Sequence, residues 1–94
     1  MDGLLAYSGR MVFERIAYTT HAYRRMNTRH IAHTDVKRIL NGPEITYPSE
    51  DEPDRIVARG HLNDGRPAGV VYTERHEREA DVLVITVIDF ESEE

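Results

Sequence analysis

The two-helix segment that decides the fold is residues 19–43, which read TTHAYRRMNTRHIAHTDVKRILNGP. Thr19 and Thr20 offer a helix N-cap, because a threonine hydroxyl can accept a hydrogen bond from the free N–H groups of the first turn. Residues 21–28 follow as the predicted first helix. At about 100° per residue, this helix has an apolar side and a basic side. The apolar side carries Ala22, Tyr23 and Met26, and the other side carries His21, Arg24, Arg25 and Thr28.

A second helix is predicted after Thr34, which is a suitable N-cap, with Asp35 favourably placed in the first turn. Its apolar stripe consists of Val36, Ile39 and Leu40. Residues 41–43 (Asn-Gly-Pro) end this helix, because proline cannot continue it. We expect Ile31 to pack between the helices, and the short connection predicts an αα-hairpin.

Beyond residue 43 the apolar residues alternate, which predicts strands. The predicted strands are residues 45–47, 55–62, 68–74 and 81–89. Residues 11–18 are a further strand candidate, with a short helix as the alternative. Residues 63–65 (Asn-Asp-Gly) favour a tight turn, so the strands on either side should pair antiparallel. Residues 81–89 contain the most apolar run, which predicts a central strand covered on both faces.

Together these elements predict an α+β fold, with two N-terminal helices packed on one face of a three- to four-stranded antiparallel sheet. If residues 11–18 join the sheet, the order is β-α-α-β-β-β. The length of 94 residues predicts a single domain over 1–94, because single cores usually run to roughly 100–150 residues. We expect residues 90–94 to form a flexible acidic tail.

Composition narrows the class of protein. The chain has no cysteine, which excludes disulfides, thiolate metal sites and a cysteine nucleophile, and fits a cytoplasmic location. No stretch approaches the roughly 20 apolar residues of a membrane span, so we expect no membrane partner. The net charge is −5, yet residues 1–49 carry seven bases against four acids, and residues 50–94 five bases against thirteen acids. This asymmetry allows an anion-binding patch in the first half; the alternative is ordinary solvated helix faces.

His21 is the main catalytic candidate. It begins a helix, where the positive end of the dipole and the neighbouring Arg24 and Arg25 favour the neutral imidazole. A neutral imidazole can accept a proton, and the two arginines can bind a phosphodiester and stabilise charge developing on its oxygens. The alternative is a histidine that only bonds to backbone or water in the first helical turn.

Arg59 and Thr86 are candidate binding residues on strands. Arg59 lies on the polar face of its predicted strand together with His61, and it adds a phosphate contact if that face borders the first helix. Thr86 interrupts the most apolar strand with one hydroxyl. The structural alternatives are a solvent-facing arginine and a threonine that simply suits a strand.

The turn between the helices carries three potential metal ligands, His30, His33 and Asp35, which lie close in sequence. Catalytic zinc normally takes three protein ligands in fixed geometry, and no recognised spacing completes such a set. We therefore expect no metal site and no cofactor.

Several motifs resemble, in order and spacing, the bacterial domain of unknown function 4258 family. The likeness covers residues 19–89 and includes THAYRRM at 20–26, RHI at 29–31, PEI at 43–45, RG at 59–60, GRP at 65–67 and VITV at 84–87. This family is placed near the RelE-like and BrnT-like ribonuclease toxins. In this resemblance His21 matches the family's helix-opening histidine, Arg24 or Arg25 its following arginine, Arg59 its basic strand position and Thr86 its strand threonine. We therefore expect His21 and Arg25 to be catalytic, and Arg24, Arg29, Arg59 and Thr86 to bind substrate.

Two functions follow as expectations. The first is a toxin-type, metal-independent RNA endonuclease, whose partners are RNA or the ribosome and a cognate antitoxin-like protein. The second is a non-catalytic regulatory module that binds a protein or an anion, suggested by the acidic total and by sheet edges able to accept a partner strand. The segment EDEPD at 50–54 is unusual for the first function, because it repels RNA.

Overall fold

The computed structural model describes residues 13–75 and 80–91. Its elements are β1 (Ile16–Tyr18), α2 (Thr20–Arg29), α3 (His33–Asn41), β2 (Ile45–Pro48), β3 (Ile56–His61), β4 (Pro67–Glu74) and β5 (Val82–Asp89). The α+β class is confirmed, and so is the predicted succession of a strand, two helices and then strands; four strands follow the helices, so the full order is β-α-α-β-β-β-β. Residues 11–12 of the predicted first strand, 76–79 of a predicted loop and 92–94 of the predicted tail lie outside the described residues.

The sheet differs from the prediction in size and in strand direction. It has five strands in the order β1-β5-β4-β3-β2, rather than three or four. Four strands pair antiparallel, but β1 runs parallel to β5, so the sheet is mixed. The reason is that β1 pairs with the last strand of the chain, and such a distant pairing leaves no trace in local periodicity.

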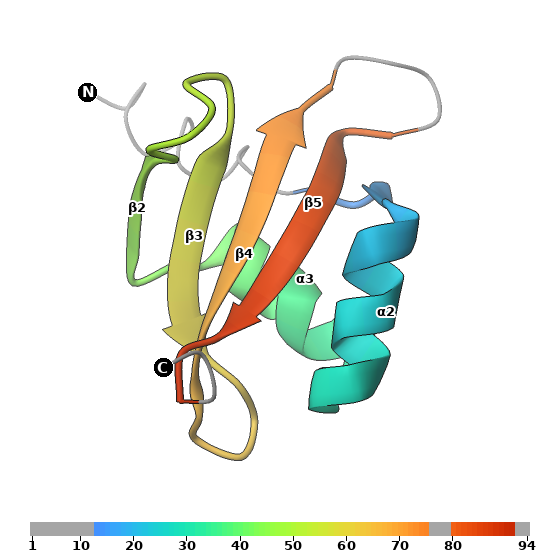
Figure 1. Cartoon of the computed structure of the whole chain (residues 1–94), viewed down its shortest axis with the longest axis vertical. Helices are drawn as coiled ribbons and strands as arrows, with labels where there is room; N and C mark the ends of the chain where they lie inside the picture. Colours follow the sequence, from blue (N-terminus) through green and yellow to red (C-terminus); the bar gives the residue numbers. More distant parts are fainter. Residues whose placement is uncertain (1–12, 76–79, 92–94) are drawn as a thin grey trace, which may run out of the picture.

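Both helices cover the same face of the sheet (Figure 1), with α2 against β5 and α3 against β3 and β4. Close approach of α3 depends on Gly60, because a Cβ there would lie 3.0 Å from Cγ1 of Ile39. The core fills the layer between helices and sheet. Its fully buried side chains include Ala22, Val36, Ile39, Ala58, Val70, Val82, Val84 and Val87.

The other face of the sheet, here called the open face, carries no helix among residues 13–75 and 80–91. Strand register places on it Ile45, Tyr47, Val57, Arg59, Gly69, Val71, Thr73, Leu83, Thr86 and Ile88. β5 is an internal strand with a neighbour on each side, but the expectation that both its faces are covered is wrong. It lies between β1 and β4, and on the open face its Leu83 and Ile88 stay half-buried.

Helix boundaries follow the predicted caps in two of three places. Thr19 caps α2, because its hydroxyl accepts a hydrogen bond from the N–H of Ala22 at 3.0 Å. Helix α3 ends at Asn41 and Gly42, as predicted. Thr34 is not the N-cap of α3: Ala32 takes that position without a side-chain bond, and the helix begins at His33. The extended backbone of Ala32 determines where α3 begins. A residue with a capping side chain is therefore not needed at this helix end.

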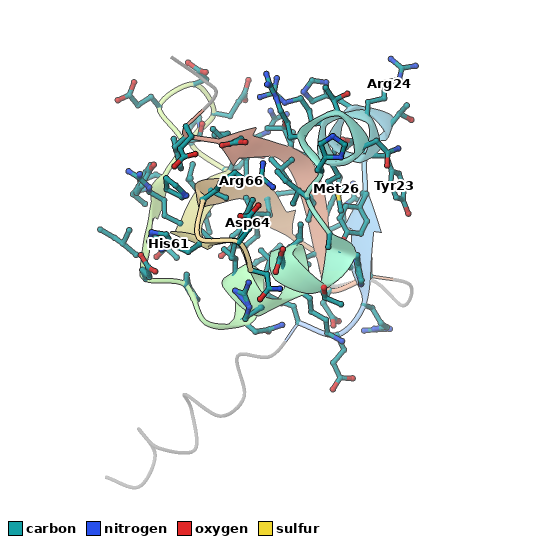
Figure 2. The ribbon with its side chains drawn as sticks, turned by 90° about the horizontal axis from the view of Figure 1, so that it is seen from below. Tyr23, Arg24, Met26, His61, Asp64 and Arg66 are labelled. Carbon is teal, nitrogen blue, oxygen red and sulfur yellow. The ribbon has the colours of Figure 1, made fainter. Side chains whose placement is uncertain are left out.

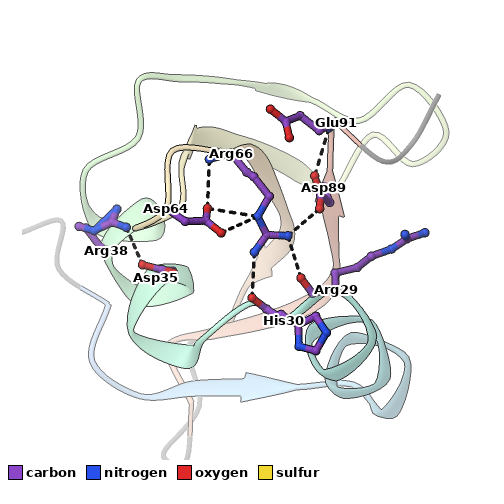
Figure 3. A network of polar contacts seen from close by, with 8 residues as sticks. All are labelled: Arg29, His30, Asp35, Arg38, Asp64, Arg66, Asp89 and Glu91. Atoms are coloured by element: carbon purple, nitrogen blue, oxygen red, sulfur yellow. Dashed lines mark hydrogen bonds and ion pairs between the residues drawn. The ribbon is translucent and has the colours of Figure 1, made fainter.

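Arg66 ties three parts of the fold together (Figure 3). Its guanidinium donates to Asp64 at 2.8 Å, to Asp89 at 2.8 Å, and to the backbone carbonyls of Arg29 at 2.8 Å and His30 at 3.0 Å. Asp89 is only 2% exposed, so Arg66 supplies its balancing charge. The two carbonyls belong to the C-terminal end of α2, where a cation is favourable. We call Asp64, Arg66 and Asp89 the Arg66 network.

A second ionic contact joins β1 to β5. The carboxylate of Asp81 accepts hydrogen bonds from the N–H groups of Glu14 and Arg15, both at 3.1 Å, and pairs with the Arg15 guanidinium at 2.7 Å. The Arg15 side chain and the two N–H groups lower the pKa of Asp81 from 3.8 to about 2. The start of β1 is therefore held by the Asp81 carboxylate, in addition to the backbone hydrogen bonds that pair β1 with β5.

The Asp81 contact predicts a measurable acid dependence of stability. Since the folded pKa is lower than the unfolded one, the unfolded chain binds more protons between pH 3.8 and about pH 2. The stabilisation is complete above pH 3.8 and is lost as the pH falls to about 2. Asp81→Asn should therefore show a weaker fall of the free energy of unfolding over this range, measured by urea titration. Asp51→Asn, an exposed acid in the 49–55 loop, is the control, and an unchanged slope in Asp81→Asn would refute the assignment.

Within residues 13–75 and 80–91, neither helix has the length and apolar character needed to cross a lipid bilayer.

Candidate functional site

One side of α2 forms a basic surface. No Asp or Glu occurs in residues 15–34, so nothing within the helix neutralises its bases. The helix periodicity turns Ala22 and Met26 into the core and leaves the basic residues outside. We call this surface the α2 basic face, and it consists of His21, Arg24, Arg25 and Arg29.

His21 occupies the first turn of α2 and is exposed. Among the described residues, it makes no hydrogen bond or ion pair that would fix its ring, and no carboxylate holds it. The imidazole is available to a ligand that approaches the amino end of the helix, which is also the favourable end for an anion.

The three arginines of the face differ in exposure. Arg24 is exposed, and Figure 2 shows its side chain on the outer side of α2. Arg25 and Arg29 are half-buried, with their Nε atoms inaccessible to solvent. In Figure 3 the Arg29 guanidinium points away from the Arg66 network, although the Arg29 carbonyl belongs to it. The face thus presents one fully extended arginine and two that are partly held against the protein.

The structure separates Arg59 from this face. Arg59 lies on the open face, where its guanidinium sits 4.0 Å above the Phe90 ring. Helix α2 packs on the opposite side of the sheet against β5, and β4 intervenes between β5 and β3, a lateral distance of about 10 Å. The face that carries Arg59 and His61 therefore does not border the first helix. Figure 2 places His61 across the molecule from Arg24.

Thr86 also lies on the open face, opposite Val71 in the register of β4 and β5. It is half-buried, and its hydroxyl donates a long 3.4 Å bond to the carbonyl of Val87. The N-terminus of α2 lies beside β5 as well, because the hydroxyl of its N-cap Thr19 donates a hydrogen bond to the carbonyl of Ile85 at 2.7 Å. Thr86 therefore follows a residue that contacts the start of α2, but Thr86 itself does not lie on the α2 basic face.

The turn between the helices does not assemble a metal site. Asp35 pairs with Arg38 at 2.6 Å, and Nδ1 of His33 is hydrogen-bonded to the Tyr18 hydroxyl. His30 takes a left-handed conformation with φ 57° and ends α2. Across the residues that the structure describes, no three His, Asp or Glu side chains are grouped as ligands.

Sequence analysis missed the Tyr18–His33 pair. The Tyr18 ring lies 5.1 Å from that of Tyr23, and burial, with a smaller contribution from Tyr23, raises the pKa of Tyr18 to about 12. The hydroxyl is therefore protonated at neutral pH, and it shares a hydrogen bond with Nδ1 of His33. The pair joins β1 to α3, elements whose contact the sequence does not signal. Phe90 was missed too, because it was assigned to the tail.

The comparisons with known proteins agree with the motifs in the helices and strands. The model of the family described as Domain of unknown function (DUF4258) matches residues 18–89, which include α2, α3 and strands β2 to β5. No curated protein matches the chain, and no solved structure matches it. The matched region is more than half of the 94 residues and contains the whole α2 basic face. The chain therefore belongs to the DUF4258 family.

Proposed function

We propose that the protein is a toxin-type, metal-independent RNA endonuclease that acts at the α2 basic face. The observation that carries this proposal is an exposed imidazole, free of carboxylates among the described residues, on a helix whose outer side is otherwise basic. A polyanion is the natural ligand of such a surface. RNA, unlike DNA, also carries the 2′-hydroxyl that a histidine can activate.

In this proposal His21 accepts the proton of a 2′-hydroxyl while the 2′-oxygen attacks the adjacent phosphorus. The bond from phosphorus to the 5′-oxygen then breaks, and water protonates the leaving oxygen. The products are a 2′,3′-cyclic phosphate and a 5′-hydroxyl. Arg25 stabilises the charge on the phosphoryl oxygens, and Arg24 and Arg29 hold neighbouring phosphates.

Arg59 and Thr86, the other predicted binding residues, have smaller roles in the proposed cleavage. Arg59 and Thr86 lie on the open face, so they do not contact the phosphate that is cleaved beside His21. They reach the ligand only if the RNA continues around the edge of the sheet. The chemical step therefore depends on α2 alone, which separates this proposal from one in which both faces form a single cleft.

Expression in a bacterial host tests the proposal directly. The wild-type chain should arrest growth and degrade RNA, whereas His21→Ala should do neither at equal protein level. Purified protein should cut RNA, alone or on ribosomes, in the presence of EDTA. If no RNA is cut between pH 6 and 8, or if His21→Ala keeps full activity, the proposal is wrong.

Removing one arginine predicts a change in salt dependence. Arg24→Gln should lower the slope of log Kd against log salt by about 0.7, the value for one phosphate contact on a single strand. The measurement is fluorescence anisotropy with a short RNA whose 2′-hydroxyls are methylated, which prevents cleavage. Lys37→Gln, an exposed base on α3, is the matched control and should leave the slope unchanged. Equal slopes for all three proteins would remove Arg24 from the interface.

A further inference from the structure

The open face exposes apolar side chains at its β2 edge. Ile45 is 56% exposed and Tyr47 37% exposed, and all four residues of β2 are exposed. In the register Tyr47 continues a row of apolar residues across the sheet, since Tyr47 pairs with Val57 and Val57 with Val71, whereas Ile45 lies opposite Arg59. Exposed apolar side chains that continue a covered surface mark an interaction site.

Strand β2 also has an unused edge. Within the residues that the structure describes, β2 pairs only with β3, so one side of its backbone faces solvent. An open edge of this kind accepts an added strand from another chain, which then continues the sheet. Added backbone hydrogen bonds supply affinity, and alternate side chains of the added strand would cover Ile45 and Tyr47.

The charge around the β2 edge indicates which kind of partner can bind there. The loop between β2 and β3 carries Glu50, Asp51, Glu52 and Asp54, all exposed. The Thr73 hydroxyl, on the open face, donates to the Asp54 carbonyl at 3.2 Å, which places this loop at the end of that face. RNA would be repelled here. Antiparallel pairing of two β2 strands would bring each acidic loop toward Glu44 of the other copy, which is also unfavourable.

We propose that the β2 edge and the adjoining open face dock an extended, basic segment of a partner protein. The segment alternates apolar residues with Lys or Arg, so that the apolar residues cover Ile45 and Tyr47 and the bases meet residues 50–54. This site is separate from the α2 basic face, and docking there does not require RNA cleavage. Failure of the nuclease proposal therefore leaves this one intact, and the reverse also holds.

A display library of random ten-residue peptides, selected on the full chain, tests the docking site. Enriched peptides should alternate apolar residues with Lys or Arg, and Ile45→Asp should weaken their binding at least tenfold. Tyr23→Asp is the matched control, because Tyr23 has the same 56% exposure but lies on α2, and it should bind as the wild type does. The double change Asp51→Lys with Glu52→Lys should abolish the preference for basic peptides.

Four results would overturn this proposal. Selection yields no binders, or it yields acidic or uncharged ones. Binding proves insensitive to Ile45→Asp. Sedimentation reveals a dimer of the chain that Ile45→Asp dissociates, which would assign the edge to a second copy. A short RNA displaces the selected peptides, which would assign the surface to nucleic acid.

Discussion

Replacing Arg66 with alanine is expected to destabilise the fold by about 3–5 kcal/mol, because removing one partner of a buried ion pair leaves the other charge buried without it. Asp89, at 2% exposure, would lose the guanidinium that lies 2.8 Å from its carboxylate. The carbonyls of Arg29 and His30 would lose a donor at the same time. Since small domains are stable by only about 5–15 kcal/mol, most of the stability would be gone. Urea denaturation followed by circular dichroism measures the change.

Arg38→Ala provides the matched control. Arg38 pairs with Asp35 at 2.6 Å, but its side chain is 51% exposed, so the loss should stay below about 1 kcal/mol. Adding Asp89→Asn to Arg66→Ala should restore part of the stability, because it removes the buried charge that Arg66→Ala exposes. If Arg66→Ala costs no more than Arg38→Ala, the Arg66 network does not hold the fold in the way its geometry indicates.

The second large effect concerns catalysis. His21→Ala should lower the single-turnover rate of RNA cleavage by about 10²–10⁴, the usual contribution of a positioned general base. Binding of the same RNA should change little, because the neighbouring arginines hold the phosphates. A loss of rate without a loss of affinity distinguishes a catalytic residue from one that only binds.

His61→Gln is the control for this measurement. His61 is an exposed histidine on β3 that pairs with Glu44 at 2.7 Å, on the face of the sheet away from α2. Its replacement should leave the rate within about twofold of wild type, since the residue lies outside the proposed site. If both variants lost the same amount of rate, the loss would reflect an effect on the fold, and His21 would have no catalytic role.

Much of the fold was predictable because the chain marks its elements locally. Thr19 caps α2, residues 41–43 end α3, and alternation locates the later strands to within one or two residues. Pairing between distant segments is not marked in this way. The parallel strand β1 depends on contacts between residues 14–18 and 81–84, which only the folded chain brings together.

The candidate site was predictable to the same extent. Helix periodicity alone puts His21 and Arg24 on the outer side of α2, and the structure agrees. Whether Arg59 joins them depends on which side of the sheet the helix covers, a property of tertiary packing. The contact between Arg66 and Asp89 has no signal in the sequence, because nothing local shows that a turn arginine will reach a carboxylate at the end of β5.

The most direct test of the proposed function is to map where RNA binds. Backbone amide NMR shifts of the full chain should be followed during titration with a short RNA whose 2′-hydroxyls are methylated. Binding at the α2 basic face predicts the largest changes at His21, Arg24 and Arg25, with Ile45, Val57 and Val71 unaffected. Changes confined to the open face, or none at millimolar RNA, would contradict the assignment of α2 as the site of cleavage.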